Sequence, residues 1–340
     1  MSRLKTLWVR EPYLGQILAG AKTVEVRVGY ENIRRLAPGD RLRLNDRHLA
    51  DVRRVANYAG FEELLAHEDP AAIAPGLPAA ELLPALRDLY PPEKEALGAV
   101  ALELAPRRYD AVLFDLGYTL VYFDPPQEVI VQEALRAAGA ERSTLEIRAA
   151  VESVWGDYYR DAETARFAPS QDHDRRVESE LSRGLLQVLG VDGGDETLSA
   201  YRRALDEGFG RPGALRPYRE VPEVLDALRS EGYRLGIVSN WSWNLRERVQ
   251  AAGLEGYFEL VWGSAYAGCN KPHPCIFEQA LEQMSLEPAR VLYAGDSYRH
   301  DVLGARGAGL AAALVDRRDG ATPRDCPVIP DLRGVLDLVS

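Results

Sequence analysis

Cysteine is scarce in this 340-residue sequence, and long hydrophobic runs are absent. The three cysteines, Cys269, Cys275 and Cys326, form no CxxC pair, so we expect neither a disulfide framework nor a zinc cluster. No apolar run approaches the roughly 20 residues that span a membrane. The first 13 residues mix charges with single apolar residues and lack the apolar core of a signal peptide. These absences favour a cytoplasmic protein with no membrane partner.

Lysine is also scarce, with only four lysines among 41 basic residues. The net charge of −11 is unevenly distributed, because residues 1–108 carry 16 Lys and Arg against 15 Asp and Glu, and the remainder carries 25 against 37. Eight of the arginines lie between Arg27 and Arg54. Such a group forms either a solvated face or a surface that contacts phosphate backbones, and the sequence leaves both interpretations open.

The length suits two domains of about 100–200 residues each. The residue pattern changes near Tyr109, so we place one domain at 1–107 and the other at 108–340. In the first domain, residues 22–28 alternate between apolar and polar as a half-buried strand does. Further strands are expected at 41–44 and 99–104, and helices at 14–18, 61–67 and 80–90. Strands at both ends with helices between them predict a small α+β barrel.

Three continuous apolar runs mark the second domain, at 111–114, 235–238 and 291–294. A run without alternation is typical of a strand buried on both faces. Helical periodicity separates the runs, so the pattern is a βαβ series that predicts an α/β domain with a doubly wound parallel sheet. Residues 124–215 interrupt the series with helical periodicity only, and we predict that they form an inserted helical cap.

Each of the three apolar runs ends in polar residues. Asp115 follows the first run, Ser239-Asn240 follows the second, and Gly295-Asp296 follows the third, with Asp301 five residues further on. Ligands of a doubly wound sheet bind at the carboxyl ends of its strands. Carboxylates and a hydroxyl that converge there form a site for an anion together with a hard cation.

Lys271 lies between the second and third runs and is the only lysine beyond Lys94. Basic positions elsewhere are nearly always arginine. A compact ammonium differs from a guanidinium fork where one group must contact both a carboxylate and a phosphoryl oxygen. The plain alternative is a solvated loop lysine.

These segments, in this order, resemble the four motifs of the haloacid dehalogenase (HAD) superfamily over roughly residues 109–335. The cap resembles the helical cap of the subfamily that includes phosphoglycolate phosphatases and 2-haloacid dehalogenases. The resemblance implies that Asp115 is the nucleophile and forms an aspartyl-phosphate, while Ser239 and Lys271 stabilise the developing charge. It implies a phosphate site formed by Thr119, Ser239, Asn240 and Lys271. It implies a Mg²⁺ site formed by Asp115, the backbone carbonyl of Gly117, Asp296 and Asp301.

The sequence departs from the phosphatase pattern directly after the nucleophile. Phosphatases of the family carry a second aspartate two residues on, which protonates the leaving oxygen and then activates water. This chain has Gly117 there, and Tyr118 where glycine is usual. General acid–base catalysis is worth about 10²–10⁴ in rate, so we expect weak activity on alkyl esters and smaller losses with acyl or aryl phosphates. Tyr118, His273 and His300 are candidates for a substitute acid.

Two other branches of the family also lack that aspartate. Dehalogenases need no metal and lose the Gly-Asp-Ser pattern, which this chain keeps from Gly295. Phosphonate hydrolases use a cap lysine, and the predicted cap contains no lysine. Both activities are therefore disfavoured. Within the cap, Trp155 and Tyr159 lie four residues apart and are expected to belong to its core.

Residues 5–104 resemble the activating-signal-cointegrator homology (ASCH) domain, a PUA-like barrel. The matching segments are 13–14, 17–20, 22–27, 38–40, 61–68 and 89–91. The resemblance implies RNA binding through Lys22, Glu25 and Arg27. The alternative is a surface ion-pair ladder on one strand face. Some ASCH proteins hydrolyse acetylated cytidine with a threonine nucleophile, but Glu25 stands at that position here, so this activity is not expected although Lys22 and Glu68 match.

The sequence therefore predicts a Mg²⁺-dependent HAD-type phosphohydrolase for a small phosphorylated substrate, joined to an ASCH domain that binds RNA or a nucleotide. The rival hypothesis is a catalytically weakened HAD module whose main role is RNA or nucleotide binding. Gly117 is the feature that keeps the rival open.

Overall fold

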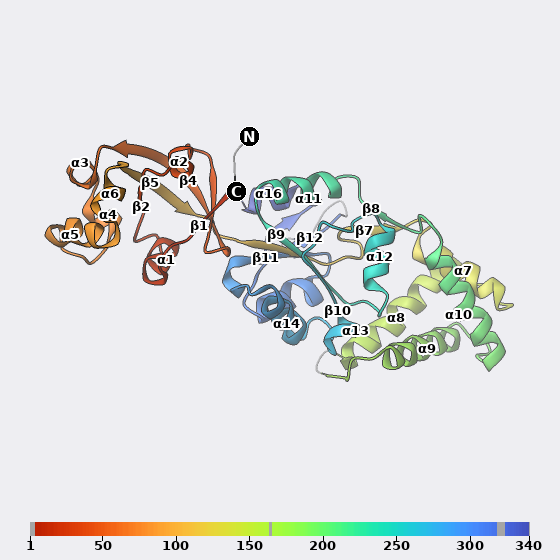
Figure 1. Ribbon diagram of the computed structural model, residues 1–340. Helices are drawn as coiled ribbons and strands as arrows, with labels where there is room; N and C mark the ends of the chain where they lie inside the picture. The colour runs from red at the N-terminus through yellow and green to blue at the C-terminus, as the bar shows by residue number, and fades with distance from the viewer. Residues whose placement is uncertain (1–3, 163–164, 318–323, 340) are drawn as a thin grey trace. The chain divides into compact units, whose positions relative to one another are not determined.

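The computed structural model describes residues 4–162, 165–317 and 324–339. The chain divides into two compact units, each with its own sheet (Figure 1). The first unit holds the residues up to Asp110 together with Ser230–Tyr233, and the second holds Ala111–Arg229 and Arg234–Val339. Within the described ranges, no helix combines the length and the apolar character that crossing a membrane requires.

The first unit contains a five-stranded sheet with the order β1-β3-β4-β5-β2. Its strands are β1 (Leu4–Leu7), β2 (Val24–Val28), β3 (Arg41–Leu44), β4 (His48–Tyr58) and β5 (Ala99–Pro106). Its helices are α1 (Glu11–Leu18), α2 (Glu31–Arg34), α3 (Phe61–His67), α4 (Pro70–Ile73), α5 (Ala79–Leu89) and α6 (Pro92–Glu95). Strands β1 and β3 are parallel, and the other pairs are antiparallel. One hydrophobic cluster packs the sheet against α1 and another packs it against α3 and α5, so the predicted small α+β fold is confirmed.

The second unit contains a six-stranded parallel sheet with the order β10-β9-β6-β11-β12-β13. Its strands are β6 (Ala111–Phe114), β9 (Arg234–Ser239), β10 (Leu260–Gly263), β11 (Val291–Gly295), β12 (Ala311–Val315) and β13 (Val328–Ile329). The central strand β6 is buried along its whole length, as its continuous apolar run predicts. The predicted doubly wound α/β fold is confirmed.

Helices cover both faces of this sheet. Helices α11 (Val221–Ser230) and α16 (Gly334–Val339) lie on one face and α14 (Pro274–Met284) lies on the other (Figure 1). Shorter helical segments complete the layers: α12 (Leu245–Ala251), α13 (Ser264–Ala267), η1 (Pro288–Arg290), η2 (Tyr298–Leu303) and α15 (Gly304–Gly307). Side chains of α14 pack against β6, β9 and β11 in one hydrophobic core cluster of the unit.

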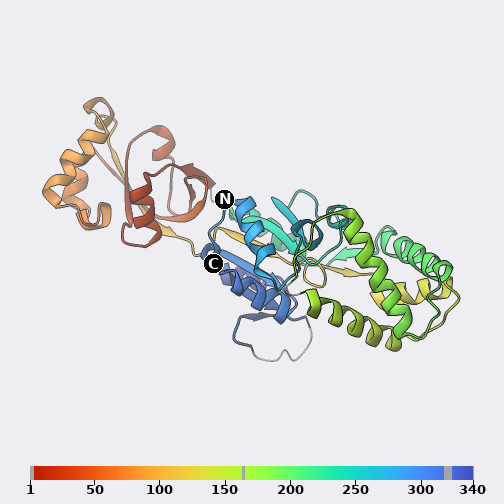
Figure 2. The same cartoon turned by 90° about the horizontal axis from the view of Figure 1, so that it is seen from below.

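A helical cap is inserted between the antiparallel strands β7 (Val121–Phe123) and β8 (Leu215–Pro217). Its helices are α7 (Gln127–Ala137), α8 (Thr144–Ala162), α9 (Gln171–Val188) and α10 (Asp195–Gly210). Figure 2 shows these helices gathered as one bundle beside the sheet. The bundle has a core of its own, which includes Leu135, Leu186 and Tyr201. The segment predicted to be a cap thus packs as a layer distinct from the sheet.

Candidate active site

Polar side chains of three neighbouring strands meet at one edge of the parallel sheet. Asp115 follows β6, Ser239 ends β9 and Asp296 follows β11. Because β6 lies between β9 and β11, the carboxyl ends of these strands are side by side. Ser239 Oγ donates a hydrogen bond to Asp115 Oδ1 at 2.8 Å. The fold therefore brings together residues that lie far apart in the sequence.

Lys271 lies at the centre of this cluster. Its Nζ donates to Oδ1 of Asp115 and to Oδ1 of Asp301, each at 2.6 Å, and to the hydroxyl of Tyr293 at 3.1 Å. Only 2% of the lysine surface is exposed, so the interpretation as a solvated loop lysine is excluded. The rare lysine of the sequence is the cation that balances two buried carboxylates.

The charges of Lys271 and Asp115 depend on each other. Burial raises the pKa of the Asp115 carboxyl, Lys271 opposes that rise, and Asp301 adds to it. Burial alone would lower the pKa of the Lys271 ammonium, but the two carboxylates outweigh burial and hold it above its ordinary value. Lys271 therefore stays protonated at neutral pH and stabilises the ionised form of Asp115.

One oxygen of Asp115 is held and the other is available. Ser239 and Lys271 both bind Oδ1, so among the described residues Oδ2 is the oxygen left for chemistry, and Asp115 lines the cavity. Asp301, in contrast, is held on both oxygens, because Ser297 N donates to its Oδ2 at 2.8 Å. Its close approach to β11 requires Gly295, where a Cβ would lie 2.3 Å from Asp301 Cγ.

Three carboxylates lie close enough together to bind one cation. One oxygen from each of Asp115, Asp296 and Asp301 lies within 4.8 Å of the others. Asp296 keeps an exposed face, but the surrounding protein, and then Asp115 and Asp301, raise the pKa of its carboxyl to about 8. This mutual repulsion indicates a place for a further positive charge. Ligands that offer only oxygen suit Mg²⁺, so the residues fit such an ion.

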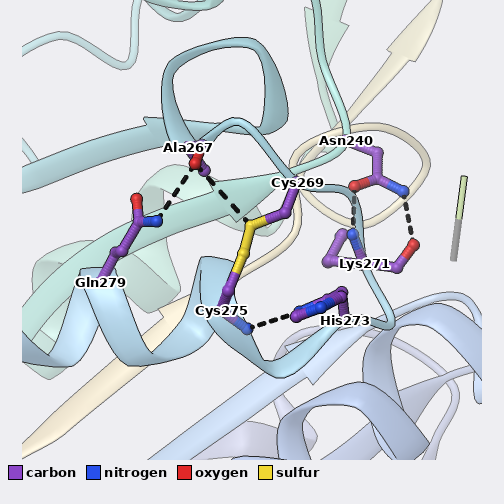
Figure 3. Close-up of a disulfide and its surroundings, with 7 residues drawn as sticks. All are labelled: Asn240, Ala267, Cys269, Lys271, His273, Cys275 and Gln279. Atoms are coloured by element: carbon purple, nitrogen blue, oxygen red, sulfur yellow. Dashed lines mark hydrogen bonds between the residues drawn. A yellow bond between two sulfur atoms is a disulfide. The ribbon is translucent and has the colours of Figure 1, made fainter. Parts of the chain in front are cut away.

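The loop that carries Lys271 is fixed on both sides (Figure 3). Asn240 Oδ1 accepts from Lys271 N at 2.7 Å and Asn240 Nδ2 donates to Lys271 O at 3.0 Å. Asn240, predicted to bind phosphate, thus holds the lysine backbone. A disulfide joins Cys269 and Cys275, which flank the lysine. The sequence analysis expected no disulfide framework and did not foresee this single bond, because the loop folds back before α14 and brings together two cysteines that form no CxxC pair.

A cavity of about 520 Å³ lies between the strand ends and the cap. The predicted site residues that line it are Asp115, Gly117, Ser239, Asn240, Lys271, Asp296 and Asp301. Thr119, predicted to bind phosphate, is not among the lining residues; it is fully buried, and its Oγ1 has no hydrogen-bond partner among the described residues. Trp155 lines the cavity instead of the cap core. The side chain of Tyr159 lies outside the described residues.

A tryptophan, not an acid, stands beside position 117. A Cβ on Gly117 would lie 3.4 Å from Cζ3 of Trp241. Apart from the adjacent residues in the chain, no other described residue has an atom within 4 Å of it. Trp241 lines the cavity and was missed by the sequence analysis. The signal was present, because Trp241 directly follows Ser239-Asn240 at a strand end.

The three candidate substitute acids differ in position. Tyr118 and His300 line the cavity, whereas His273 does not and instead caps α14, where its Nδ1 accepts from Cys275 N at 3.1 Å. Tyr118 has φ 56°, a left-handed conformation that costs a non-glycine residue about 1 kcal/mol. Tyr118 is 43% exposed, but the surrounding protein, and to a lesser extent Glu128, raises its pKa to about 12, which is far from the near-neutral pKa of an efficient general acid.

A second cavity, of about 240 Å³, lies in the first unit and is lined by Lys22, Glu25 and Arg27. Glu25 pairs with Lys22 Nζ at 3.2 Å and with Arg27 Nη2 at 2.8 Å. Lys22 and Glu25 are buried, and Lys22 Nζ also donates to Ile73 O of α4 at 2.5 Å. The expectation that β2 is half-buried, and the alternative of a surface ladder, were both wrong for these two residues. Helix α1 packs on the sheet face that Glu25 shares with Leu102 of β5, and Lys22 lies over the Tyr13 ring of α1.

The arginines of the first unit are largely neutralised by local partners. At least five of the eight arginines between Arg27 and Arg54 form ion pairs: Arg27 with Glu25, Arg35 with Glu31, Arg41 with Asp51, Arg47 with Glu11, and Arg54 with Glu68 and Glu103. This pattern favours the solvated face over a continuous surface for phosphate backbones.

Comparison with known proteins assigns both units. Residues 109–309 match the haloacid dehalogenase-like hydrolase family, and residues 7–108 match the ASCH domain. The chain belongs to the haloacid dehalogenase-like hydrolases. This HAD hydrolase therefore has the fused architecture that its sequence predicts.

Relatives of the HAD hydrolase include named phosphatases. It is 30% identical to the phosphoserine phosphatase of Thermus thermophilus over 239 residues, which are 65% of this chain and 94% of that protein. It is 29% identical to the glyceraldehyde 3-phosphate phosphatase of Methanopyrus kandleri over 238 residues, which are 67% of this chain and 96% of that one. The HAD-hydrolase YfnB of Bacillus subtilis, 21% identical, shares the fold with a TM-score of 0.56 over 68% of this chain and 99% of that one. The relatives support a phosphohydrolase.

Proposed function

We propose that the second unit is a Mg²⁺-dependent phosphohydrolase that acts on a small phosphorylated substrate through an aspartyl-phosphate on Asp115. The observation that carries the proposal is the asymmetry of Asp115, whose Oδ1 is held by Ser239 and Lys271 while Oδ2 is available at the cavity. A carboxylate oriented in this way is prepared to act as a nucleophile.

The proposed reaction has two half-reactions. Oδ2 of Asp115 attacks phosphorus, and the bond between phosphorus and the leaving oxygen breaks. The Lys271 ammonium and the Ser239 hydroxyl donate to the phosphoryl oxygens as negative charge develops. Water then attacks the phosphorus of the aspartyl-phosphate, which releases inorganic phosphate and restores the carboxylate. Mg²⁺, bound by Asp115, Asp296, the carbonyl of Gly117 and directly or indirectly by Asp301, would neutralise phosphoryl charge.

Release of phosphate from acetyl phosphate tests this proposal, because an acyl phosphate needs no protonation of its leaving group. We expect turnover that requires Mg²⁺ and that the Asp115→Asn variant lacks, together with acid-stable capture of a phosphorylated protein in the native chain only. Turnover that is equal in the native protein and the variant would contradict the proposal.

The titration of Asp296 predicts how Mg²⁺ binding depends on pH. Its folded pKa of about 8 lies above the ordinary 3.8, so the folded protein holds a proton that the unfolded chain has lost. The stabilisation from this group is therefore present at low pH and is lost as pH rises through about 8 in the absence of metal. Mg²⁺ replaces that proton, so we expect it to raise the Tm of the second unit more at pH 8.5 than at pH 6. Equal Tm shifts at both pH values, or an unchanged Mg²⁺ response in Asp296→Asn, would contradict the assignment.

We further propose that the ASCH domain binds RNA or a nucleotide in its cavity. Support comes from the charged group of Lys22, Glu25 and Arg27 beside the aromatic side chains of Tyr13 and Tyr90 in the same cavity. A cation that can contact phosphate beside rings that can stack on a base suits single-stranded RNA.

A filter-binding titration with RNA at several salt concentrations tests the second proposal. Arg27→Ala is expected to weaken binding and to reduce the salt slope by about one. Arg35→Ala is the matched control, because Arg35 is exposed, pairs with Glu31 and does not line the cavity. An affinity that depends neither on salt nor on Arg27 would exclude RNA binding at this cavity.

A specific observation also favours the rival function, in which the HAD module is catalytically weak and ligand binding by the ASCH domain is the main role. Position 117 carries no acid and borders the Trp241 ring. The acetyl phosphate assay separates the two, because the rival predicts Mg²⁺ binding without turnover above the Asp115→Asn control.

A further inference from the structure

The wall of the active-site cavity next to Asp115 is built from aromatic rings. Four of the lining residues, Tyr118, Phe123, Phe209 and Trp241, form a connected group. Phe123 packs edge-on against Phe209 with centroids 5.1 Å apart and against Tyr118 at 6.1 Å, and it stacks on Trp241 at 6.3 Å with an interplanar angle of 22°. Tyr118 follows strand β6 and Trp241 follows strand β9, while Phe123 ends strand β7 and Phe209 lies on the cap helix α10. The group therefore forms only when the chain is folded.

The Trp241 ring is held in place. Its Nε1 donates to Asn244 Oδ1 at 3.1 Å, and Phe123 covers one side of it. Because the indole N–H is already hydrogen-bonded, the surface of Trp241 that remains for contacts in the cavity is apolar. The ring borders Gly117, two residues from the nucleophile. An aromatic ring thus lies beside the polar residues at the floor of the cavity.

The direction of attack decides which part of the substrate meets these rings. The phosphoryl group must lie on the floor formed by Asp115, Ser239 and Lys271, where the donors are. In an in-line displacement the leaving oxygen lies opposite the attacking oxygen. The leaving group therefore points from the floor into the cavity, whose lining includes these rings, and apolar surface that packs on them is removed from water.

The same wall supplies no efficient proton donor beside position 117. The Tyr118 hydroxyl already donates to Gln127 Oε1 at 3.1 Å, and position 117 is a glycine, which has no side chain to donate a proton. An alkoxide leaves slowly without a proton, whereas a phenol ionises near pH 10, which is about the pKa of a tyrosine side chain. An aromatic leaving group thus fits two independent features of the site: the rings that line the cavity, and the absence of an acidic side chain at position 117.

We propose that the preferred substrate is an aryl phosphate, a phosphate monoester of a phenolic hydroxyl whose ring packs against Trp241, Phe123 and Phe209. This inference rests on the proposed phosphohydrolase function and specifies its substrate class. Oδ2 of Asp115 forms the bond to phosphorus, the bond from phosphorus to the aryl oxygen breaks, and the phenolate leaves with the electron pair and takes its proton from water.

Three substrates separate ring recognition from leaving-group chemistry. Phenyl phosphate has a ring and a phenolate leaving group, benzyl phosphate has a ring and an alkoxide leaving group, and acetyl phosphate has no ring. We expect kcat/KM for phenyl phosphate to exceed that for benzyl phosphate by about 10², because no acid assists the alkoxide. In Trp241→Ala the ratio of kcat/KM for phenyl phosphate to that for acetyl phosphate is expected to fall about tenfold, and Trp241→Phe should restore most of it.

The outcomes distinguish this inference from the function on which it rests. Turnover of acetyl phosphate that depends on Asp115, with phenyl phosphate no better than benzyl phosphate, overturns the substrate class and leaves the phosphohydrolase in place. No turnover of any substrate above Asp115→Asn overturns the phosphohydrolase.

A binding measurement keeps the ring contact testable without turnover and without a variant that must fold. Calorimetry on the full chain with Mg²⁺ compares phenylphosphonate with methylphosphonate, two analogues that cannot be hydrolysed. Binding of the phenyl analogue about tenfold tighter supports the aromatic wall as the site for the leaving group. Equal affinities refute it.

Discussion

Replacing Gly117 with aspartate is expected to raise kcat for an alkyl phosphate such as β-glycerol phosphate by about 10² or more. The added carboxyl would supply the proton that an alkoxide needs, and general acid catalysis is worth about 10²–10⁴. The position can accept the side chain, because a Cβ there would meet Trp241 Cζ3 at 3.4 Å, an ordinary van der Waals contact. Initial rates at saturating substrate measure the effect.

Gly117→Asn is the matched control for this gain, since it has the same size and shape but no acidic proton. The gain should also depend on the substrate: it should be large for an alkyl phosphate and small for phenyl or acetyl phosphate, whose leaving groups need little help. If Gly117→Asp gains nothing over Gly117→Asn, the native site already uses another acid, or uses none, and His300 becomes the residue to substitute next.

Replacing Lys271 with methionine is expected to destabilise the second unit by about 3–5 kcal/mol, as removal of one partner of a buried ion pair does. The ammonium lies 2.6 Å from oxygens of both Asp115 and Asp301, and methionine fills its volume without its charge. A loss of that size corresponds to a fall in Tm of about 10 °C for a unit of this length. Circular dichroism melting at pH 7 measures it.

Lys94→Met is the control, because Lys94 is exposed and its loss should leave the Tm unchanged. The loss in Lys271→Met should diminish when Asp301→Asn is added, since the double variant leaves one unpaired carboxylate fewer. It should also diminish at low pH, where the orphaned carboxylates are protonated. A Lys271→Met Tm equal to that of the native protein would show that the ion pair contributes no net stability.

The sheet and its polar edge could be predicted because both depend on local sequence. Strands β6, β9 and β11 are continuous apolar runs, and each is followed at once by polar residues, so the βαβ pattern alone places Asp115, Ser239 and Asp296 at one edge. The contact of Lys271 with two carboxylates needed more than its position, but its rarity singled it out. These features are encoded in short segments and in their order.

Other features depend on packing between distant segments, and no local pattern encodes them. Glu25 on β2 is buried on the sheet face that it shares with Leu102 of the distant strand β5, where α1 packs, so its alternation pattern alone suggested a solvent face. Phe209 contacts Phe123 only because the cap helix α10 packs beside strand β7 in the folded chain. The long strand β4 has an irregularity in its pairing between Val52 and Arg54. This irregularity breaks the alternation of apolar and polar residues from which the strand could have been predicted.

Because Cys269 and Cys275 form a disulfide, the covalent state of a sample depends on whether it is kept with a reductant. Protein kept with a thiol reductant and protein kept in air are two covalent species that differ on either side of Lys271. Compartments that keep thiols reduced would favour the first species and oxidising ones the second. Cys326 is free and buried, so under denaturing conditions the bonded chain has one reactive thiol and the reduced chain has three. Rate constants from different preparations can therefore be compared only after the number of reactive thiols in each preparation has been measured.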